Sequence, residues 1–248
     1  MGRKNILIDT GGAIEYKRET WRGERKNSIV DNTTIPYLKS LGIKKIDYFV
    51  ASHGDADHIG ESINLVTNFK VENVIFNCGS DNFLERKLVG LLNQKNINYY
   101  KCVDKISLDD NTLYFLNTRE FNDENNNSNV IYLDIYNYNF LFMGDAGVDR
   151  EYELLKNYNL SNIDFLKIGH HGSNTSSSKK FINSVKPKYS IISVGKDNKF
   201  GHPKDEVLDT LKNSKIYRTD LDGSIEIKVN NNGYRISACY LKTIYFSW

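Results

Sequence analysis

The sequence has few cysteines, and their arrangement limits what they can do. Cys78, Cys102 and Cys239 are the three cysteines in 248 residues, and no two of them form a CxxC motif. An odd number of cysteines without that spacing is not typical of a disulfide framework or of a thiolate zinc site. We therefore expect all three to be small, buried core residues.

Long apolar runs and a charge excess are also lacking. No segment approaches the roughly 18 consecutive apolar residues of a membrane-spanning helix, and the N-terminus lacks the pattern of an export signal. We therefore expect a standalone chain to be cytoplasmic. The 33 basic and 31 acidic side chains leave a net charge of +2, which gives no global reason to expect a nucleic acid partner, although local basic patches are compatible with one.

Linkers and repeats are the last features the sequence does not have. Neither a Pro-rich or Ser-rich linker nor an internal repeat divides the chain, which predicts one domain over residues 1–248. Short apolar runs instead alternate with turn residues and helical patterns, and this order predicts an α/β (layered α+β) fold. Residues 12–28 are charged and aperiodic and are expected to be a surface loop. The polar run at residues 122–129 is expected to be a loop.

The individual elements follow from the periodicity of the apolar residues. Strands are expected at Asn5–Asp9, Asp47–Ser52, Asn73–Phe76, Tyr99–Cys102, Asp164–Ile168 and Tyr189–Val194, with hairpins within residues 130–145 and across Gly223–Val229 and Tyr234–Tyr240. Helices are expected at Thr34–Leu41, around Leu84, Leu88, Leu91 and Leu92, at Val148–Tyr158, from near Ser176, and at Lys204–Lys212.

One stretch, ASHGDADHIG at residues 51–60, crowds four ligand-type side chains into six positions. His53 and Asp55 are two residues apart, so on an extended segment they lie on the same side and can bind one ion. Asp57 and His58 can bind a second ion if the chain turns there. The alternative is that Asp55 or Asp57 caps a helix. Four such residues together favour a metal site.

The other three histidines and two further aspartates also follow apolar runs. His170 and His171 lie in KIGHHGSNTSSS, His202 lies in FGHP, and Asp9 and Asp145 each follow a predicted strand. Polar residues at strand exits gather along one edge of a sheet, where active sites are commonly built. We expect Asp9 to orient a ligand.

Together these motifs resemble the metallo-β-lactamase superfamily, and specifically the C-terminal hydrolase (nuclease) domain of ComEC-type DNA internalisation competence proteins. The matching stretches are NILIDTGG, ASHGDADHIG, FLFMGDAG, DFLKIGHHGSNTSSS, YSIISVGKDNKFGHP and TDLDGSIEI. The resemblance implies an αββα sandwich of two mixed β-sheets flanked by helices, with the site at their shared edge. The hairpin that usually precedes the LIDTGG segment is expected to be absent. If the chain is part of a ComEC-type protein, the extracytoplasmic side of the membrane is implied instead.

The resemblance also implies two divalent metal ions, Zn²⁺ or Mn²⁺, and their ligands. Position by position, these are His53 and Asp55 for one ion, Asp57 and His58 for the other, Asp145 between them, and His171 closing the second site. Asp55 stands where many members have a histidine, and an oxygen ligand makes manganese as credible as zinc. The usual histidine of the third motif is absent, since Ser128–Val130 occupy that position.

The catalytic residues implied are Asp57, His171 and His202. The closing metal ligand stays open among the histidines downstream of Asp145, and His202 is alternatively the proton donor to the leaving group. His170 either contacts substrate or supports a ligand. Ser173 and Thr175 precede a helix whose N–H groups favour a phosphate, the alternative being a simply N-capped helix.

A basic cluster surrounds His202. Lys199, with Lys196 and Lys204 nearby, is expected to follow a nucleic-acid backbone while Phe200 stacks on a base, the alternative being a solvated surface. The hypothesis is a phosphodiesterase or nuclease that hydrolyses DNA with a water activated by two metal ions. Its rivals are a hydrolase of another small ester, lactone or nucleotide, and a non-catalytic nucleic-acid-binding or regulatory module.

Overall fold

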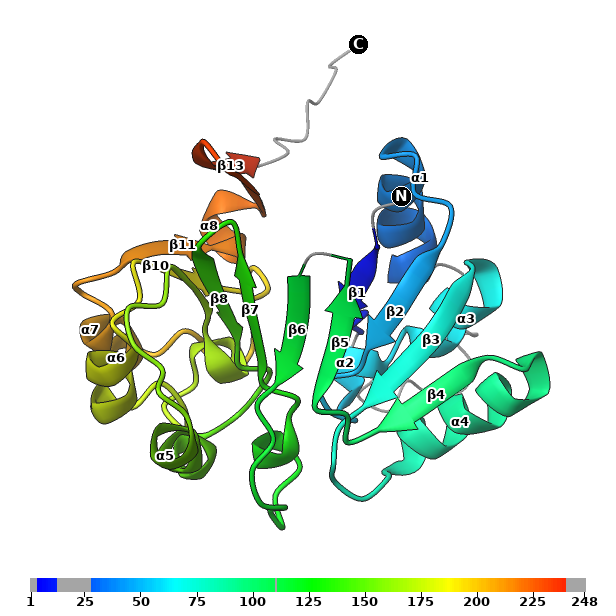
Figure 1. The fold of residues 1–248 in the computed structure, drawn as a ribbon, viewed down its shortest axis with the longest axis horizontal. Helices are drawn as coiled ribbons and strands as arrows, with labels where there is room; N and C mark the ends of the chain where they lie inside the picture. Colours follow the sequence, from blue (N-terminus) through cyan, green and yellow to red (C-terminus); the bar gives the residue numbers. More distant parts are fainter. Residues whose placement is uncertain (1–3, 13–27, 110, 240–248) are drawn as a thin grey trace. The chain divides into compact units, whose positions relative to one another are not determined.

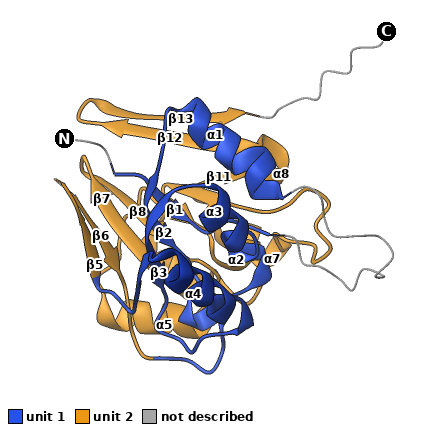
Figure 2. Cartoon of the chain, turned by 90° about the vertical axis from the view of Figure 1, so that its right-hand side faces the viewer, with its two compact units in different colours: residues 1–104, 120–129 blue, residues 105–119, 130–248 orange. Residues whose placement is uncertain are grey.

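The computed structural model describes residues 4–12, 28–109 and 111–239 (Figure 1). Most of the loop expected at residues 12–28, and Tyr240 at the end of the expected terminal hairpin, lie outside the described residues. The chain divides into two compact units (Figure 2): residues 1–104 with 120–129, called unit 1, and residues 105–119 with 130–248, called unit 2. Within the described ranges, none of the helices has the length and apolar character needed to cross a membrane.

The described part of unit 1 contains a sheet in the order β1-β2-β3-β4, and all three of its strand pairs are parallel. Its strands are β1 (Ile6–Ile8), β2 (Ile46–Val50), β3 (Val71–Phe76) and β4 (Asn98–Lys101); its helices are η2 (Val30–Thr34), α1 (Ile35–Ser40), α2 (Ala56–Ile59), α3 (Ser62–Asn68), α4 (Phe83–Lys95) and η3 (Asn125–Asn127). We expected a mixed sheet; this one is parallel because helical crossovers, not tight turns, join its successive strands.

Helix α4 shows how the sequence builds this unit. Asn82 and Glu85 form a reciprocal capping box at its start, in which Asn82 Oδ1 accepts from the Glu85 N–H and the Glu85 carboxylate accepts from the Asn82 N–H. Leu88 and Leu92, from the predicted apolar face, are fully buried in the same core cluster as Phe49 of β2. The helix therefore forms where both its cap and its apolar spacing indicate.

Unit 2 contains a mixed sheet in the order β11-β10-β9-β8-β7-β6-β5, and a hairpin of β12 and β13, among its described residues. The strands are β5 (Lys105–Leu108), β6 (Asn111–Phe115), β7 (Ile131–Ile135), β8 (Tyr138–Phe142), β9 (Phe165–Lys167), β10 (Tyr189–Ile192), β11 (Lys215–Arg218), β12 (Ser224–Asn230) and β13 (Gly233–Cys239); the helices are α5 (Val148–Asn157), η4 (Gly169–Gly172), α6 (Lys179–Val185), α7 (Asp205–Thr210) and α8 (Thr219–Asp222). The α/β class is confirmed, whereas β5, β6 and β11 were not predicted.

The core of unit 2 lies where helices α5, α6 and α7 pack on the sheet. Leu154, Phe181 and Val207, one from each helix, are buried in one cluster with Leu141 of β8 and Leu166 of β9. The antiparallel pair β7–β8 confirms the hairpin predicted within residues 130–145. Its turn residues, Tyr136 and Asn137, both have positive φ, as two-residue hairpin turns require.

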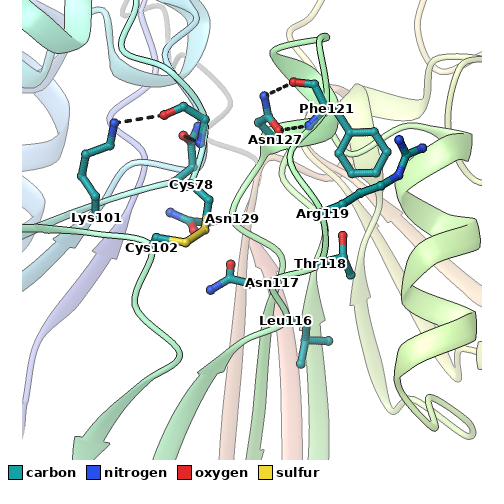
Figure 3. Close-up of a disulfide and its surroundings, with 12 residues drawn as sticks. Cys78, Lys101, Cys102, Leu116, Asn117, Thr118, Arg119, Phe121, Asn127 and Asn129 are labelled. Carbon is teal, nitrogen blue, oxygen red and sulfur yellow. Dashed lines mark hydrogen bonds between the residues drawn. A yellow bond between two sulfur atoms is a disulfide. The ribbon is translucent and has the colours of Figure 1, made fainter.

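The prediction for the cysteines is wrong. Cys78 and Cys102 form a disulfide with a Cα–Cα distance of 4.4 Å (Figure 3), and Cys239 is exposed. The pair comes together because each residue lies just beyond the end of one of two neighbouring parallel strands, β3 and β4, although 24 residues separate them in sequence. Linear spacing carries no sign of this proximity. Lys101 adds a second link, since its Nζ donates to the Gly79 carbonyl at 3.0 Å.

Candidate metal centre

In unit 1, the polar side chains that follow β1 and β2 meet because the carboxyl ends of parallel strands lie at the same edge of a sheet. Asp9, just after β1, accepts hydrogen bonds from the Ser52 N–H at 2.7 Å, the Ser52 hydroxyl at 2.8 Å and His58 Nδ1 at 2.8 Å. A carboxylate can only accept, so Nδ1 of His58 carries the proton. This leaves His58 Nε2 with a lone pair for a metal, and the expected orienting role of Asp9 is supported.

The two histidines of ASHGDADHIG lie together in the interior of unit 1. His53 and His58 are 0% and 4% exposed, and their ring centroids are 4.1 Å apart. His53 Nε2 lies 3.5 Å from Asp55 Oδ2, so both atoms can reach a common ion. Asp57 and His58 also offer ligand atoms within 4.8 Å of each other. The spacing argument for two His/Asp pairs therefore agrees with the local geometry.

Helix capping does not explain the side chain of Asp55. Asp55 occupies the N-cap position of α2, but its side chain makes no capping hydrogen bond. The carboxylate instead lies beside His53 Nε2. The structure therefore does not support the capping alternative for Asp55, and the orientation of its carboxylate is compatible with an ion shared with His53.

The loop that carries His53 is held in place by two other segments of unit 1. The Gly54 N–H donates to Glu124 Oε1 at 2.8 Å. A Cβ added to Gly54 would lie 1.9 Å from Asn82 Nδ2, so only glycine fits against the cap of α4. Asn129 donates from its backbone N–H to the Ser52 carbonyl at 2.7 Å and from Nδ2 to the Ala51 carbonyl at 2.8 Å.

Residues 126–129 of the predicted loop are therefore buried and support the candidate centre. Asparagine side chains can be buried in this way because each amide both donates and accepts hydrogen bonds, so its polar atoms can find partners inside the protein. Asn127 does so by bonding both the N–H and the carbonyl of Phe121 at 2.8 Å (Figure 3). The run of asparagines in NDENNNSN is the sequence feature that indicates such a hydrogen-bonded, buried turn. Its high polarity instead favours the interpretation as a plain loop.

In unit 2, an aspartate and two histidines form a second group. Asp145 follows β8 and is 2% exposed. His170 Nε2 and His171 Nε2 lie 3.8 Å and 3.7 Å from the same Asp145 oxygen, Oδ2. His171 Nδ1 is 2.8 Å from the Ser193 carbonyl, to which it can only donate, and His170 Nδ1 is 2.9 Å from Thr175 Oγ1. His171 thus presents an unprotonated Nε2 in its neutral form, as a metal ligand must.

The backbone that presents these histidines is strained. His170, His171 and Gly172 have φ of +46°, +53° and +83°, a region that L side chains rarely adopt. A Cβ on Gly172 would lie 2.5 Å from Pro203 Cβ, so this position also requires glycine. The turn is anchored by the His170 N–H, which donates to the Gly144 carbonyl at 3.1 Å. Such strain is commonly stored at functional sites.

His202 lies next to this group. Its ring centroid is 6.0 Å from that of His170, and its Nδ1 is buried with no hydrogen-bond partner among the described residues. Burial lowers the pKa of His202, and the neighbouring His170 and Lys204 lower it further. The imidazole is therefore neutral at neutral pH. A neutral ring can bind a metal or accept a proton, whereas the predicted role as a proton donor requires the charged form.

The Ser-rich turn at residues 173–178 stabilises the start of α6 and holds a buried carboxylate. Ser178 caps α6 by accepting from the Phe181 N–H at 3.2 Å, which supports the capping alternative. The N–H groups of Ser177 and Ser178 donate to the carboxylate of Glu151, and burial raises the pKa of that carboxyl. The N–H groups expected to hold a phosphate are thus already partly used.

Ser173, predicted to contact substrate, is buried, and its Oγ accepts from Thr175 Oγ1 at 3.0 Å. Thr175 in turn lies against His170 and is exposed, as is Lys199. Ser173 therefore positions Thr175, while Thr175 and Lys199 are accessible to a substrate.

The donor sets in both units fit divalent ions. Each unit offers imidazole nitrogen together with carboxylate oxygen, the ligands that suit zinc and manganese. In each unit one histidine has its Nδ1 fixed by an acceptor, the carboxylate of Asp9 for His58 and the carbonyl of Ser193 for His171. Such outer partners are a regular feature of metal-binding histidines.

Comparison with known proteins agrees with this geometry. A family model described as the metallo-β-lactamase superfamily matches residues 2–196, and the chain belongs to this superfamily of hydrolases. ComE operon protein 3 of Bacillus subtilis (strain 168) is 31% identical over 237 residues, which cover 92% of this chain and 30% of the relative. Competence protein ComA of Neisseria gonorrhoeae is 30% identical over 221 residues, which cover 86% of this chain and 29% of the relative.

The chain thus spans less than a third of these relatives. Among solved structures, CmlA β-hydroxylase resembles the chain with a TM-score of 0.52 at 12% identity, covering 94% of this chain and 50% of that protein, which supports the fold alone.

Proposed function

We propose that the protein is a phosphodiesterase that hydrolyses DNA with the help of two divalent ions. The observation that carries the proposal is the pair of fixed histidines, His58 held by Asp9 and His171 held by Ser193, each beside a carboxylate of its own unit. A structural zinc site needs one set of four ligands, whereas this chain carries one His/Asp group in each unit. These groups supply the mixed nitrogen and oxygen ligands that catalytic dinuclear sites use.

In this proposal the ligands keep the assignment that the motifs imply: His53 and Asp55 for one ion, Asp57 and His58 for the other, with Asp145 shared and His171 closing the second site. Two bound ions would lower the pKa of a water and stabilise the charge that develops when a phosphodiester is displaced. The residues of the chain orient this chemistry, since Asp9 fixes the tautomer of His58 and Ser193 that of His171. His202 supplies a neutral imidazole that accepts a proton or completes the ligand set.

DNA is proposed as the substrate on two grounds. The first is that one relative is named a competence protein, and another, recombination protein 2 of Haemophilus influenzae, is 27% identical over 245 residues, which cover 99% of this chain and 28% of the relative. The second ground is local: Lys196 and Lys199 are exposed on the loop that leads to His202. Basic side chains beside a diester-hydrolysing site give the electrostatic attraction that a phosphate backbone needs.

The test is cleavage of single-stranded and duplex DNA by purified protein with Mn²⁺ or Zn²⁺. We expect cleavage that requires metal and that is lost in Asp57→Ala and in Asp145→Ala, one variant for each unit. Asp104→Ala, which removes an exposed carboxylate of unit 1 that has no place in the proposed site, is the matched control and should cleave like wild type. Absence of cleavage, or equal cleavage by Asp57→Ala, would contradict the proposal.

The same preparation separates the rival functions. Metal analysis that finds two ions per chain, together with hydrolysis of a lactone or a small nucleotide but not DNA, would favour another hydrolase. DNA binding without any metal-dependent turnover would favour the regulatory module.

For the location, we propose the extracytoplasmic side of the membrane. The Cys78–Cys102 disulfide supports this side, because disulfides persist in oxidising compartments and are rare in the cytosol. Alkylation of the protein in intact cells, followed by mass spectrometry, tests this. Free thiols at both positions in the native host would contradict it.

A further inference from the structure

An exposed aromatic ring in unit 2 has no role in the core. Phe200 lies between β10 and α7 and is 53% exposed. Its ring is nearly parallel to that of His202, with an interplanar angle of 16° and 5.8 Å between the centroids. The phenyl ring is therefore stacked beside a histidine of the candidate centre. A single exposed apolar side chain is ordinary in itself, so the position of Phe200 beside a histidine of the candidate centre is what distinguishes it.

The loop around this ring is held by its own hydrogen bonds. Asn198 Oδ1 accepts from the His202 N–H at 2.8 Å, and Asn198 Nδ2 donates to the His202 carbonyl at 2.7 Å. Lys204 Nζ donates to the Phe200 carbonyl at 2.7 Å. The backbone is thus fixed on both sides of the ring. A ring presented by a fixed backbone loses little conformational entropy when a ligand packs on it.

The ring also lies close to the chemistry that the candidate centre would perform. His202 connects Phe200 to His170, with 6.0 Å between the histidine centroids, and His170 Nε2 is 3.8 Å from Asp145 Oδ2. The exposed lysines at positions 196 and 199 belong to the same loop. An exposed aromatic ring flanked by cations, within about one nucleotide of a phosphate-hydrolysing group, is the arrangement by which proteins bind single-stranded nucleic acid.

We propose that Phe200 is a stacking platform for an unpaired nucleobase next to the scissile phosphate. This inference rests on the proposed function and adds a strand preference to it. Bases inside a duplex are already stacked on their neighbours and must be extruded to reach the ring, which costs the free energy of their pairing and stacking. Single strands and frayed ends are therefore preferred over internal duplex positions.

The direct test is binding without turnover. A single-stranded oligonucleotide carrying 2-aminopurine is titrated with the full chain in the presence of a chelator, and stacking is read as loss of 2-aminopurine fluorescence. Wild type and Phe200→Trp should quench the probe. Phe200→Ala should not quench it and should bind about 5- to 150-fold more weakly, as expected for losing one stacked base. An oligonucleotide with abasic sites should bind wild type and Phe200→Ala equally.

Tyr152→Ala is the matched control, because Tyr152 is a 49% exposed aromatic of the same unit on α5, away from the loop. It should quench and bind like wild type. Phe200→Leu keeps apolar bulk without an aromatic face and should behave like Phe200→Ala, so it decides the question if the alanine variant does not fold. Equal quenching by all variants, or equal affinity of wild type for abasic and intact DNA, would overturn the proposal.

The two proposals fail in different ways. If wild type quenches the probe but cleaves no diester with metal, the proposed function is wrong, and only the stacking of a base on Phe200 stands, without a scissile phosphate beside it. If DNA is cleaved with metal but Phe200→Ala binds and cleaves single strands like wild type, the platform is wrong and the proposed function stands.

Discussion

Replacing Asp9 by Asn should weaken both metal binding and folding in unit 1. The carboxylate accepts three hydrogen bonds, from the Ser52 N–H, the Ser52 hydroxyl and His58 Nδ1. An amide keeps one acceptor and places an NH₂ group where Oδ2 meets the other two donors. His58 can then keep its bond only by moving its proton from Nδ1 to Nε2, and a protonated Nε2 has no lone pair for a metal.

The magnitude follows from these bonds. Loss of an orienting partner typically weakens metal binding by about 10- to 100-fold, and we expect Asp9→Asn to fall in this range for Mn²⁺ or Zn²⁺. Two hydrogen bonds to a charged group are also lost. Each is worth about 1.5–3 kcal/mol, and the amide recovers part of this, so the free energy of unfolding without metal should fall by about 3 kcal/mol.

The assay is a competition titration of each ion against a fluorescent chelator, with urea unfolding of the metal-free protein in parallel. Asp47→Asn is the matched control. Asp47 is also buried, at 2% exposure, and it is paired with the Asn5 N–H at 2.8 Å and with Lys45 Nζ at 3.0 Å at the start of β2, away from the histidines. It should lose stability and keep its metal affinity. A folded Asp9→Asn protein that binds metal like wild type would refute the reasoning.

Three further outcomes are expected. Replacing Cys78 and Cys102 together by Ser removes the disulfide that closes a loop between residues 24 apart in sequence. The free energy of unfolding in urea should fall by about 3 kcal/mol. Wild type treated with a dithiol reductant should have the same lower stability as this variant, and equal stability of the variant and oxidised wild type would contradict the role of the disulfide. Leu88→Ala on α4 removes a fully buried side chain and should cost about 2–5 kcal/mol in the same assay, whereas a cost below about 1 kcal/mol would contradict its packing. Burial raises the pKa of Glu151 above 4.5, so its contribution to stability is complete below pH 4.5 and is lost as pH rises through the folded pKa; Glu151→Gln should remove this part of the pH dependence of the unfolding free energy, and an unchanged profile would argue against it.

The sequence predicted most strands and helices because apolar periodicity and capping residues are local signals. Three strands, β5, β6 and β11, were not predicted. Lys105–Leu108 and Lys215–Arg218 are four residues long and contain charged residues, and Asn111–Phe115 begins with polar ones. They are strands because neighbouring strands pair with them, and that is a tertiary effect which periodicity does not carry.

The candidate centre was predictable as a set of residues but not as a geometry. Motif spacing identified His53, His58 and Asp145 as candidate metal ligands, because polar residues just beyond the ends of strands gather at one edge of a sheet. It could not reveal which nitrogen of each histidine is already used, since the acceptors, Asp9 and the Ser193 carbonyl, lie 49 and 22 residues away in sequence. The disulfide and the buried asparagines were missed for the same reason: their partners are set by the fold.

The left-handed turn at His170 and His171 has a consequence for engineering. Each histidine there holds a backbone conformation that costs an L residue about 1–2 kcal/mol and costs glycine almost nothing. Screening variants for heat resistance alone would therefore reward glycine at both positions and discard the two imidazoles. A thermostable version of this protein selected without an activity screen should lose these candidate ligands, and stabilising changes are better sought in α4 or in helices α5, α6 and α7 of unit 2.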